Sequence, residues 1–417
     1  MEDAKLRILV VSQYFWPENM RINDLVEGFM KKGHEVTVLT SLPNYPVGKL
    51  FSEYKKKPSD YGFYKGAQII RVPMFLRGTR RLMLALNYLS FFSSASTIGV
   101  VKLRKYKFDV IFVYAISPIM AAIPAIIIGR LKAAPVFLWV LDLWPETLSA
   151  VGAIKNNFII RIIGRLVSWI YNHTDYILIQ SQSFKSAVLE YCTRFISDKR
   201  LIYFPSWAED AFSSITTASQ FLQRDENLFT IMFAGNIGEA QDFPAIIDAF
   251  EKLKTYETIR LVIVGDGSML CWVKNEVKAR QLNNVILLGR YPVEKIPGLF
   301  FCADALLVSL KDNNIFSKTI PGKLQAYLAS GKPVIGMING EAADVIKLAG
   351  GLVGAAGDAY RLVENIKYLS ELGRLDREKI GKQAIAFYNN HFSSKKLFDK
   401  LEMLFKSATL RRKNSHS

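Results

Sequence analysis

The sequence has few residues of the types that bind metals or form disulfide bonds. Its 417 residues include only three cysteines and four histidines. The cysteines are far apart and have apolar or ordinary helical neighbours, which indicates reduced structural thiols in a cytosolic protein. The histidines form no cluster in the sequence, so we expect no metal site. The residues concerned are Cys192, Cys271, Cys302, His34, His173, His391 and His416.

Signals for export and for membrane spanning are also lacking. The first residues, "MEDAKLRILVVSQYF", place acidic side chains before a short apolar run, which predicts a buried first strand rather than a signal peptide. Val110–Ile128 is uncharged and almost long enough to cross a bilayer, but it contains Ser117, Pro118 and Pro124. We expect this run to form a buried strand followed by a helix, and we expect no transmembrane helix.

Acidic residues are outnumbered by basic ones, 37 to 54, which gives a net charge of +17. Half of the residues are hydrophobic, and the length is sufficient for two or more domains with ample cores. The positive surplus suits a polyanionic partner, such as nucleic acid, an anionic membrane surface or a phosphorylated ligand. The sequence contains no basic-aromatic motif of a known nucleic-acid module, so a nucleic-acid-binding protein is the least favoured class.

Apolar β-rich runs alternate with helical patterns along the chain, which predicts parallel sheets covered on both faces by helices. The series restarts after the linker Tyr203–Asp210. We therefore predict two doubly wound α/β domains, residues 1–204 and 205–380. A helical segment, residues 381–417, follows, with a break at Asn389, Asn390 and "HFSSKK" (residues 391–396) and a disordered basic tail. The expected strands are Arg7–Ser12, Val36–Thr40, Ile69–Pro73, Val110–Tyr114, Val136–Leu141, Tyr176–Gln180, Phe229–Ala234, Arg260–Val264, Val285–Leu288, Ala305–Ser309 and Pro333–Met337.

In such sheets, ligands bind at the carboxyl ends of the strands. Asp142 is the first polar residue after one apolar strand, where a carboxylate can accept a proton from an attacking hydroxyl. The same aspartate could instead cap the following turn, and the residues alone favour neither reading. Asn19 and Arg21 lie where the loop after the first strand enters a helix, which can present backbone amides to a phosphate. The alternative there is a surface turn.

The second domain has glycines after three of its strands. Gly235 and Gly238 follow the first, the segment "VGDGS" follows the next, and "LGRY" with Arg290 follows a third. Packing could explain each glycine singly, but together they predict a phosphate-binding edge with exposed backbone donors.

The segment "TIPGKLQAYLASGKPVI", residues 319–335, predicts a short helix that Pro321 and Gly322 open. Lys323 lies in its first turn, where the helix dipole favours anions. This lysine is either a solvated surface residue or a ligand for an incoming anion. Beside the three glycine-bearing strand ends, the second reading suits a nucleoside diphosphate.

Several of these segments, "SQYFWPE", "GHEVTVLT", "DLWPE", "FAGNIG", "VGDGS" and "LASGKPVI", occur in the order found in a known family. The chain resembles the retaining GT-B glycosyltransferases of glycosyltransferase family four, from Arg7 to about Phe405. The resemblance is nearest to the bacterial L-fucosamine (N-acetyl-L-fucosamine, FucNAc) transferase type of O-antigen and capsule biosynthesis.

The resemblance implies two Rossmann-like domains facing a central cleft, with the acceptor on the first and a nucleotide-sugar donor, a UDP-sugar, on the second. It implies a retaining hexosyltransferase that needs no metal and no cofactor. Asp142 would contact the transferred sugar and, with Lys323, carry catalysis. The donor-binding candidates are Pro17, Asn19, Arg21, Gly235, Asn236, Gly238, Gln241, Gly265, Asp266, Gly267, Arg290, Lys318, Thr319, Pro321, Gly322, Leu324 and Gln325.

The sequence departs from the family pattern at its charged positions. An arginine and a lysine normally neutralise the diphosphate, and here Asn236 and Gln241 stand in their places. Lys318 and Lys323 offer replacement cations. The family's paired glutamates are missing as well: the matching positions are Lys318 and Ala326, or Ser317 and Gln325 in a register shifted by one residue.

The expected reaction moves an amino sugar to a polyprenyl-diphosphate-linked acceptor for bacterial surface polysaccharide or lipopolysaccharide. Leu76–Phe108 is apolar and aromatic with basic ends, which is typical of a helix that lies on anionic lipid. We therefore expect a cytoplasmic enzyme peripheral to the inner face of the plasma membrane. A helix packed on the sheet is the alternative for this segment. The rival activity is a nucleotide-sugar 2-epimerase of the same fold.

Overall fold

The computed structural model describes residues 5–78, 80–150, 154, 156–193, 200–212 and 221–414. The chain divides into two compact units. The first contains Met1–Pro205 together with Lys395–Ser417, and the second contains Ser206–Ser394. The end of the chain thus returns to the first unit instead of forming a separate segment, and the last helix runs to Asn414, through most of the tail expected to be disordered.

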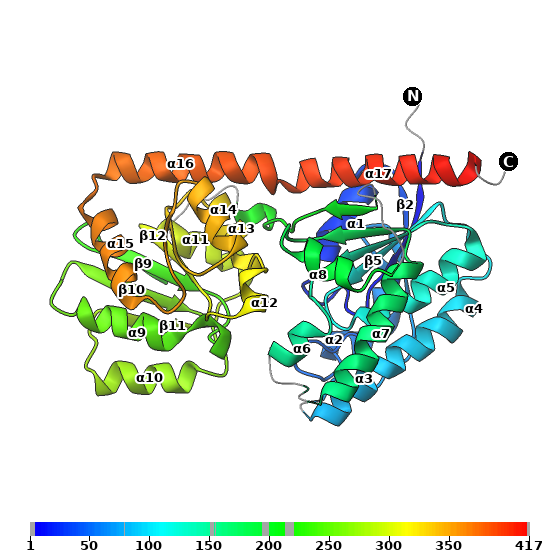
Figure 1. Ribbon diagram of the computed structural model, residues 1–417, viewed down its shortest axis with the longest axis horizontal. Coiled ribbons are helices and arrows are strands. Elements are labelled where there is room, and N and C mark those ends of the chain that lie inside the picture. The colour runs from blue at the N-terminus through cyan, green and yellow to red at the C-terminus, as the bar shows by residue number, and fades with distance from the viewer. Residues whose placement is uncertain are drawn as a thin grey trace. The chain divides into compact units, whose positions relative to one another are not determined.

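The first unit is built on an eight-stranded sheet with the order β3-β4-β2-β1-β5-β6-β7-β8 (Figure 1). All neighbours are parallel except β3 and β4. Every residue of β5 and β6 is buried, because helices cover both faces of the sheet. The strands are β1 Arg7–Val11, β2 Glu35–Thr40, β3 Phe63–Tyr64, β4 Ala67–Arg71, β5 Val110–Ala115, β6 Val136–Val140, β7 Tyr176–Ile179 and β8 Leu201–Tyr203.

The helices of the first unit follow the expected alternation with strands. The uncharged run Val110–Ile128 forms β5, a short 3-10 turn and most of α5, so the prediction of a strand followed by a helix is confirmed. The helices are α1 Arg21–Lys31, α2 Ser52–Lys56, α3 Arg81–Ser94, α4 Val100–Lys102, α5 Ala122–Lys132, α6 Glu146–Ala150, α7 Asn157–His173, α8 Phe184–Glu190 and α17 Ser394–Asn414.

One helical stretch of the described chain has the length and composition to cross a membrane. It is Leu82–Lys102, which comprises most of α3, a π-helical turn at Ala95–Gly99 and α4, with a mean hydropathy of 1.4. Only 22% of its apolar window is buried. It coincides with the segment whose sequence predicts a helix with basic ends.

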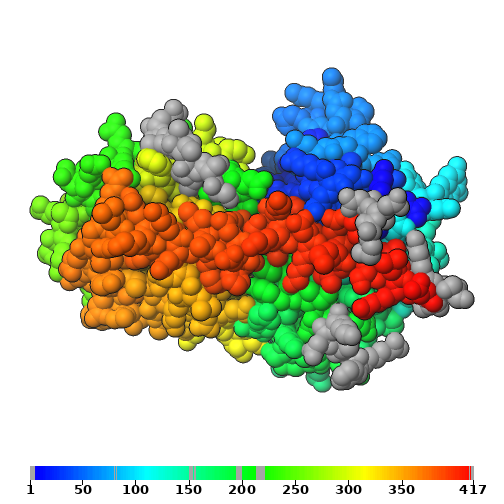
Figure 2. Space-filling view, turned by 90° about the horizontal axis from the view of Figure 1, so that it is seen from above, coloured from blue at the N-terminus to red at the C-terminus, as the bar shows by residue number. Residues whose placement is uncertain are grey.

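Helix α17 completes the core of the first unit. Phe405 is fully buried against the rings of Phe29, Phe112 and Phe137, at centroid distances of 5.6, 6.1 and 4.8 Å. At the edge of this contact, Lys32 forms ion pairs with Asp399 and Glu402 of α17. The opposite face of the helix, shown in red in Figure 2, lies at the surface.

The second unit has a six-stranded, fully parallel sheet with the order β11-β10-β9-β12-β13-β14. Its strands are β9 Phe229–Ala234, β10 Ile259–Val264, β11 Val285–Gly289, β12 Ala305–Ser309, β13 Val334–Met337 and β14 Leu352–Gly354. Its helices are α9 Phe243–Lys252, α10 Leu270–Ala279, α11 Ile296–Phe301, α12 Asn314–Ser317, α13 Gly322–Ala329, α14 Glu341–Leu348, α15 Ala359–Glu371 and α16 Arg374–His391. Helix α16 continues through Asn389 and Asn390, and the break falls at Phe392 and Ser393, within the predicted segment "HFSSKK".

Candidate functional site

The glycine-bearing loops after β9 and β10 pack directly on each other. Gly235 and Gly265 have positive φ angles of 140° and 148°, which glycine adopts without strain. A Cβ on Gly265 would lie 1.8 Å from the carbonyl oxygen of Gly235, and one on Gly267 would lie 2.3 Å from that of Ile237. Contact between the two loops therefore requires Gly265 and Gly267, independently of any ligand.

Lys323 points from the first turn of α13 toward the end of β9. Its Nζ is buried, although the residue as a whole is partly exposed, and within the described part of the chain it has no hydrogen-bond partner. It lies 3.7 Å from the centre of the Phe233 ring, and a Cβ on Gly235 would be 2.9 Å away from it. Burial lowers the pKa of Lys323 to about 7. Burying an ammonium without a counter-ion raises the free energy of the folded protein. Binding of an anion beside Lys323 would lower it again.

Helix α13 is attached to β9 one turn further on. The Tyr327 hydroxyl donates a hydrogen bond to the carbonyl oxygen of Ala234 and accepts one from its N–H, at 2.9 and 2.8 Å. Tyr327 is 1% exposed, so this pair of buried hydrogen bonds fixes α13 against the strand. The tyrosine thereby holds the first turn of α13, and Lys323 with it, beside the glycine loop.

The start of α13 offers fewer free donors than the sequence predicts. The amides of Thr319 and Leu324 already donate to Phe316 and Pro321. Leu324 is fully buried, and Gln325 is 1% exposed, with a side chain oriented to bond the carbonyls of Pro321 and Gly322. Both side chains therefore belong to the core, so the predicted donor contact of Leu324 and Gln325 is left to their backbone atoms and stays a prediction. At Gly322, by contrast, the space beside Cα is open.

The two uncharged residues that replace the family's cations lie against each other. Asn236 donates to Oε1 of Gln241 at 3.3 Å, and the N–H of Gly238 donates to the same oxygen at 3.0 Å. These bonds shape the loop after β9. Asp266 is used locally too, since it accepts from the N–H of Gly267 at 2.7 Å.

The remaining candidates of this unit are placed at the same edge of the sheet. Arg290 directly follows β11, two strands from β9, and is exposed. Lys318 ends α12, just before the turn into α13. The structure thus brings together the Gly235 loop, Phe233 and Lys323, and it places Arg290 and Lys318 farther along the same edge.

In the first unit, Asp142 follows β6 at the carboxyl edge of the sheet. It is half-buried and makes no hydrogen bond to the described residues. Burial raises the pKa of Asp142 to about 7. Such a carboxyl group is suited to exchanging protons near neutral pH.

Tyr114 is a neighbour of Asp142 that the sequence did not single out. It lies near the end of β5, the strand beside β6, and its ring contacts Trp139 at 5.5 Å. Burial raises the pKa of Tyr114, Arg21 opposes this shift, and Asp142 adds to it. The structure therefore brings Arg21, Tyr114 and Asp142 together. The sequence signal that could have identified Tyr114 is a hydroxyl group at the carboxyl end of a buried strand.

Glu18 organises the loop after β1, and sequence reasoning missed it as well. Its carboxylate accepts three backbone hydrogen bonds, from Phe15 at 3.0 Å, Asn44 at 2.8 Å and Tyr45 at 2.6 Å. Burial raises the pKa of Glu18 to about 7, although these three donors oppose the shift. Pro17 and Asn19 flank this residue, so Glu18 fixes the backbone that carries them.

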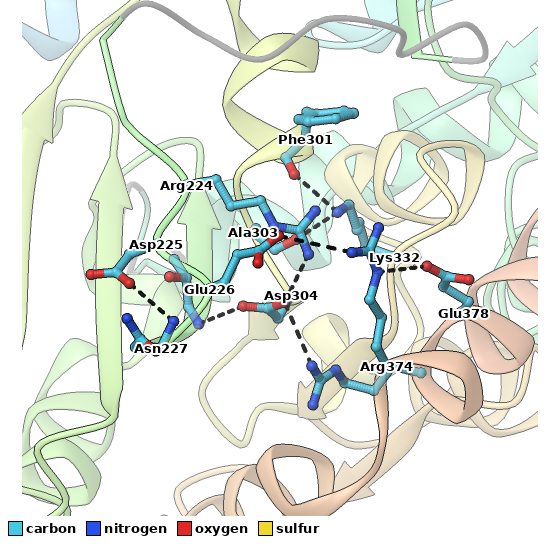
Figure 3. Close-up of polar contacts among 12 residues, drawn as sticks. Arg224, Asp225, Glu226, Asn227, Phe301, Ala303, Asp304, Lys332, Arg374 and Glu378 are labelled. Carbon is cyan, nitrogen blue, oxygen red and sulfur yellow. Dashed lines mark hydrogen bonds and ion pairs between the residues drawn. The ribbon is translucent and has the colours of Figure 1, made fainter.

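A polar cavity of about 550 Å³ lies at the opposite, amino-terminal edge of the second unit's sheet (Figure 3). Asp304 accepts from the N–H of Thr230 and faces Arg224 and Arg377 at 3.6 and 4.0 Å. Lys332 donates to the carbonyl oxygens of residues 301 and 303, and burial lowers its pKa to about 8. The carboxylate of Asp304 is paired with arginines, and Lys332 is bonded to backbone carbonyls. We therefore interpret this group as a structural cluster. Among the described residues, no group of three or more His, Cys, Asp or Glu side chains could hold a metal ion.

Comparison with known proteins gives a match within the second unit. Residues 214–387 match the family Glycosyl transferases group 1. The matched residues cover most of the second unit. Across both units, the chain is 24% identical over 343 residues to the putative colanic acid biosynthesis glycosyl transferase WcaI of Escherichia coli K12. This alignment covers 78% of the chain and 82% of the relative.

Solved structures show the same fold. Anabaena HepE, determined in complex with UDP and glucose, has a TM-score of 0.68 at 14% identity and covers 96% of this chain and 100% of its own. Sucrose-phosphate synthase of Thermosynechococcus elongatus has a TM-score of 0.70 at 12% identity, with coverages of 97% and 99%. The predicted GT-B architecture, with two Rossmann-like sheets, is confirmed.

Proposed function

We propose that the protein is a retaining, metal-independent hexosyltransferase that uses a nucleoside-diphosphate sugar, a UDP-sugar, as donor and needs no cofactor. The observation that supports this most directly is the buried, unpaired ammonium of Lys323 beside the glycine loop of a group 1 glycosyltransferase domain. A diphosphate is the anion that such a domain would supply. The UDP in the structure of Anabaena HepE supports the choice of nucleotide.

In this proposal, Lys323 stabilises the negative charge that grows on the departing diphosphate. The free amide of Gly322 and the cations of Lys318 and Arg290 assist it from the same edge of the sheet. A preorganised donor of this type commonly lowers a barrier by about 3 kcal/mol. The energy spent on burying an unpaired ammonium is recovered only when the anion is bound.

Asp142 acts on the acceptor side in the first unit. With a pKa raised to about 7, it is ionised in part at neutral pH and can take the proton of the attacking hydroxyl. Tyr114, at the end of the neighbouring strand β5, lies close to it, and Arg21 acts on the same tyrosine. Pro17 and Asn19 flank Glu18, which fixes the loop that carries these two donor-binding candidates. The acceptor hydroxyl would approach this end of β6.

The acceptor we propose is a sugar carried on polyprenyl diphosphate, and the transferred sugar is N-acetyl-L-fucosamine or a related amino sugar. The similarity to a colanic acid biosynthesis glycosyltransferase supports a role in bacterial surface polysaccharide. The exposed apolar stretch Leu82–Lys102 supports peripheral attachment to the inner face of the plasma membrane. The group 1 match favours transfer over epimerisation.

A panel of nucleotide sugars tests this function in two steps. Thermal stabilisation of the protein identifies the donor, because a ligand that binds only the folded state raises its stability. Transfer is then measured with that donor and a polyprenyl-linked acceptor. We expect stabilisation by one UDP-sugar and product only when acceptor is present. Conversion of the donor without acceptor would indicate an epimerase instead.

A further inference from the structure

Helix α3 has one face fixed to the first unit and one face uncovered. Asn87 is fully buried, donates to the carbonyl oxygen of Phe75 and accepts from the side chain of Gln13, at 2.6 and 2.8 Å. Phe91 is also fully buried on this side. On the other side, Leu82 and Leu89 are 72% and 48% exposed. Because its buried face is part of the core, α3 is held on the unit and not free to leave it.

A groove runs between the uncovered face of α3 and the segment that follows β4. It has a volume of about 660 Å³, which is in the range of small-molecule sites, about 300–1,000 Å³. Pro73, Met74 and Phe75 form one wall, and Leu86, Leu89 and a row of hydroxyl residues form the other. Phe75 is 63% exposed, so a large apolar side chain stands uncovered at the groove.

Three of the hydroxyl groups along this groove, those of Ser90, Ser94 and Thr97, are already bonded within the protein. Ser90 Oγ donates to the carbonyl oxygen of Asn87 and accepts from the N–H of Phe75. Ser94 donates to residue 91 and Thr97 to residue 93. The groove therefore offers carbon surface and few polar contacts, which favours a hydrocarbon ligand over a sugar or a nucleotide.

Positive charge surrounds the groove. Residues 61–108 contain nine lysines and arginines and no acidic residue. Arg77, two residues after Phe75, is half-buried and donates to the Tyr14 hydroxyl at 3.2 Å. Arg80 is exposed at the N-cap of α3, where the helix dipole also attracts anions. Both arginines lie in the segment that leads from the groove wall into the helix, so a hydrocarbon ligand with an anionic head matches this surface.

The groove also lies at the edge of the sheet that carries Asp142. Pro73 and Phe75 follow the carboxyl end of β4, as Asp142 follows that of β6, in one parallel sheet. We propose that the groove binds the isoprenoid chain of the lipid-linked acceptor, with its diphosphate at Arg77 and Arg80. This inference rests on the proposed function. It assigns the isoprenoid chain to one groove of the protein, which differs from general contact between the protein and a bilayer.

Binding of isoprenoid diphosphates of different chain length tests the groove without donor or turnover. The probes are geranylgeranyl diphosphate, below its critical micelle concentration, and isopentenyl diphosphate, which shares the head group. We expect the longer probe to bind at least about tenfold more tightly, because each buried methylene adds affinity. Ser93→Phe, in the groove, should remove this advantage. Ser52→Phe, on exposed α2 of the same unit, is the matched control and should retain it.

Two binding outcomes and one transfer outcome would overturn the proposal. One is equal affinity for the long and the short probe. The other is a wild-type preference for the long probe in Ser93→Phe while the protein still floats with anionic vesicles, which would assign the uncovered face to the bilayer alone. Normal sugar transfer to a long-chain acceptor by Ser93→Phe would refute the groove and leave the proposed function intact. Chain-dependent binding without any sugar transfer would do the reverse.

Discussion

The Nζ atom of Lys323 lies 3.7 Å from the centre of the Phe233 ring and has no hydrogen-bond partner among the described residues. A desolvated cation over an aromatic face gains about 2 kcal/mol, whereas burying an ammonium costs several. The contact with Phe233 thus compensates for only part of the burial, consistent with the lowering of the pKa of Lys323 to about 7. The charged form of Lys323 is therefore destabilised at the carboxyl end of β9, and a bound anion would stabilise it.

Replacing Lys323 by methionine should stabilise the ligand-free protein and abolish its response to UDP. The unfolded lysine has a pKa near 10.5, so between pH 7 and 10.5 the unfolded state binds more protons and wild-type stability rises with pH. At pH 7.5, Lys323→Met should raise the free energy of unfolding by about 1–4 kcal/mol. Urea unfolding with and without UDP measures both effects. Lys347→Met, at an exposed position of α14, should change neither, and a destabilised Lys323→Met that still binds UDP would contradict this account.

Asp142→Asn should lower the rate of sugar transfer by about 10²–10⁴, the usual contribution of a general base. Since burial raises the pKa of Asp142 to about 7, the wild-type rate should increase with pH through that value and then level off. The asparagine variant should lack this step but bind UDP normally. Initial rates between pH 5.5 and 8.5 provide the comparison, with Asp60→Asn as the exposed control. An unchanged rate would remove Asp142 from the mechanism.

Glu18→Gln should lower the free energy of unfolding of the first unit, although it replaces only one carboxylate oxygen by an NH2 group. The amide group would present N–H donors to a site where three backbone N–H groups need acceptors. Leaving such a donor without a partner costs about 1–3 kcal/mol. Chemical unfolding should show this loss, and the KM for the donor should rise because the loop with the donor-binding candidates Pro17 and Asn19 loses its fixed shape. Glu53→Gln, at an exposed site, should leave both quantities unchanged; equal behaviour of the two variants would disprove the role of Glu18.

Phe405→Ala should destabilise the first unit by about 3–5 kcal/mol, the usual cost of deleting a fully buried aromatic ring. The ring belongs to α17, yet it packs against Phe29, Phe112 and Phe137, so the effect should appear in the N-terminal part of the chain. Hydrogen exchange of β1 and β5 would locate it. Met403→Ala, on the same helix and 71% exposed, is the control. Unchanged exchange of β1 and β5 in Phe405→Ala would show that α17 is not part of this core.

The central strands were predictable because continuous apolar runs leave few alternatives to buried parallel strands, and β9 and β12 have the bounds predicted. The edge strands β3, β8 and β14 have only two or three residues, too few for a periodic pattern. Nor does the sequence show which unit the last helix completes, since that depends on contacts such as Phe405 with Phe112, almost 300 residues apart.

Within the candidate site, the position of Lys323 at a helix start followed from local sequence rules, and its burial did not. The glycines were predicted for a ligand, but Gly265 is required by the carbonyl oxygen of Gly235 on a neighbouring loop. Glu18 was missed because its partners Asn44 and Tyr45 lie 26 and 27 residues away along the chain. Contacts of this kind are set by packing in three dimensions, which a pattern of residue types does not contain.

The most direct test of the central claim is the number of protons taken up when UDP binds. Calorimetric titration at pH 8, in buffers with different ionisation enthalpies, measures this number. With a pKa of about 7, Lys323 is mostly neutral in the free protein at pH 8 and becomes charged beside the diphosphate. We predict the uptake of close to one proton by the wild type and none by Lys323→Met. Binding of UDP by the wild type without proton uptake would contradict the assignment of Lys323 as the diphosphate ligand.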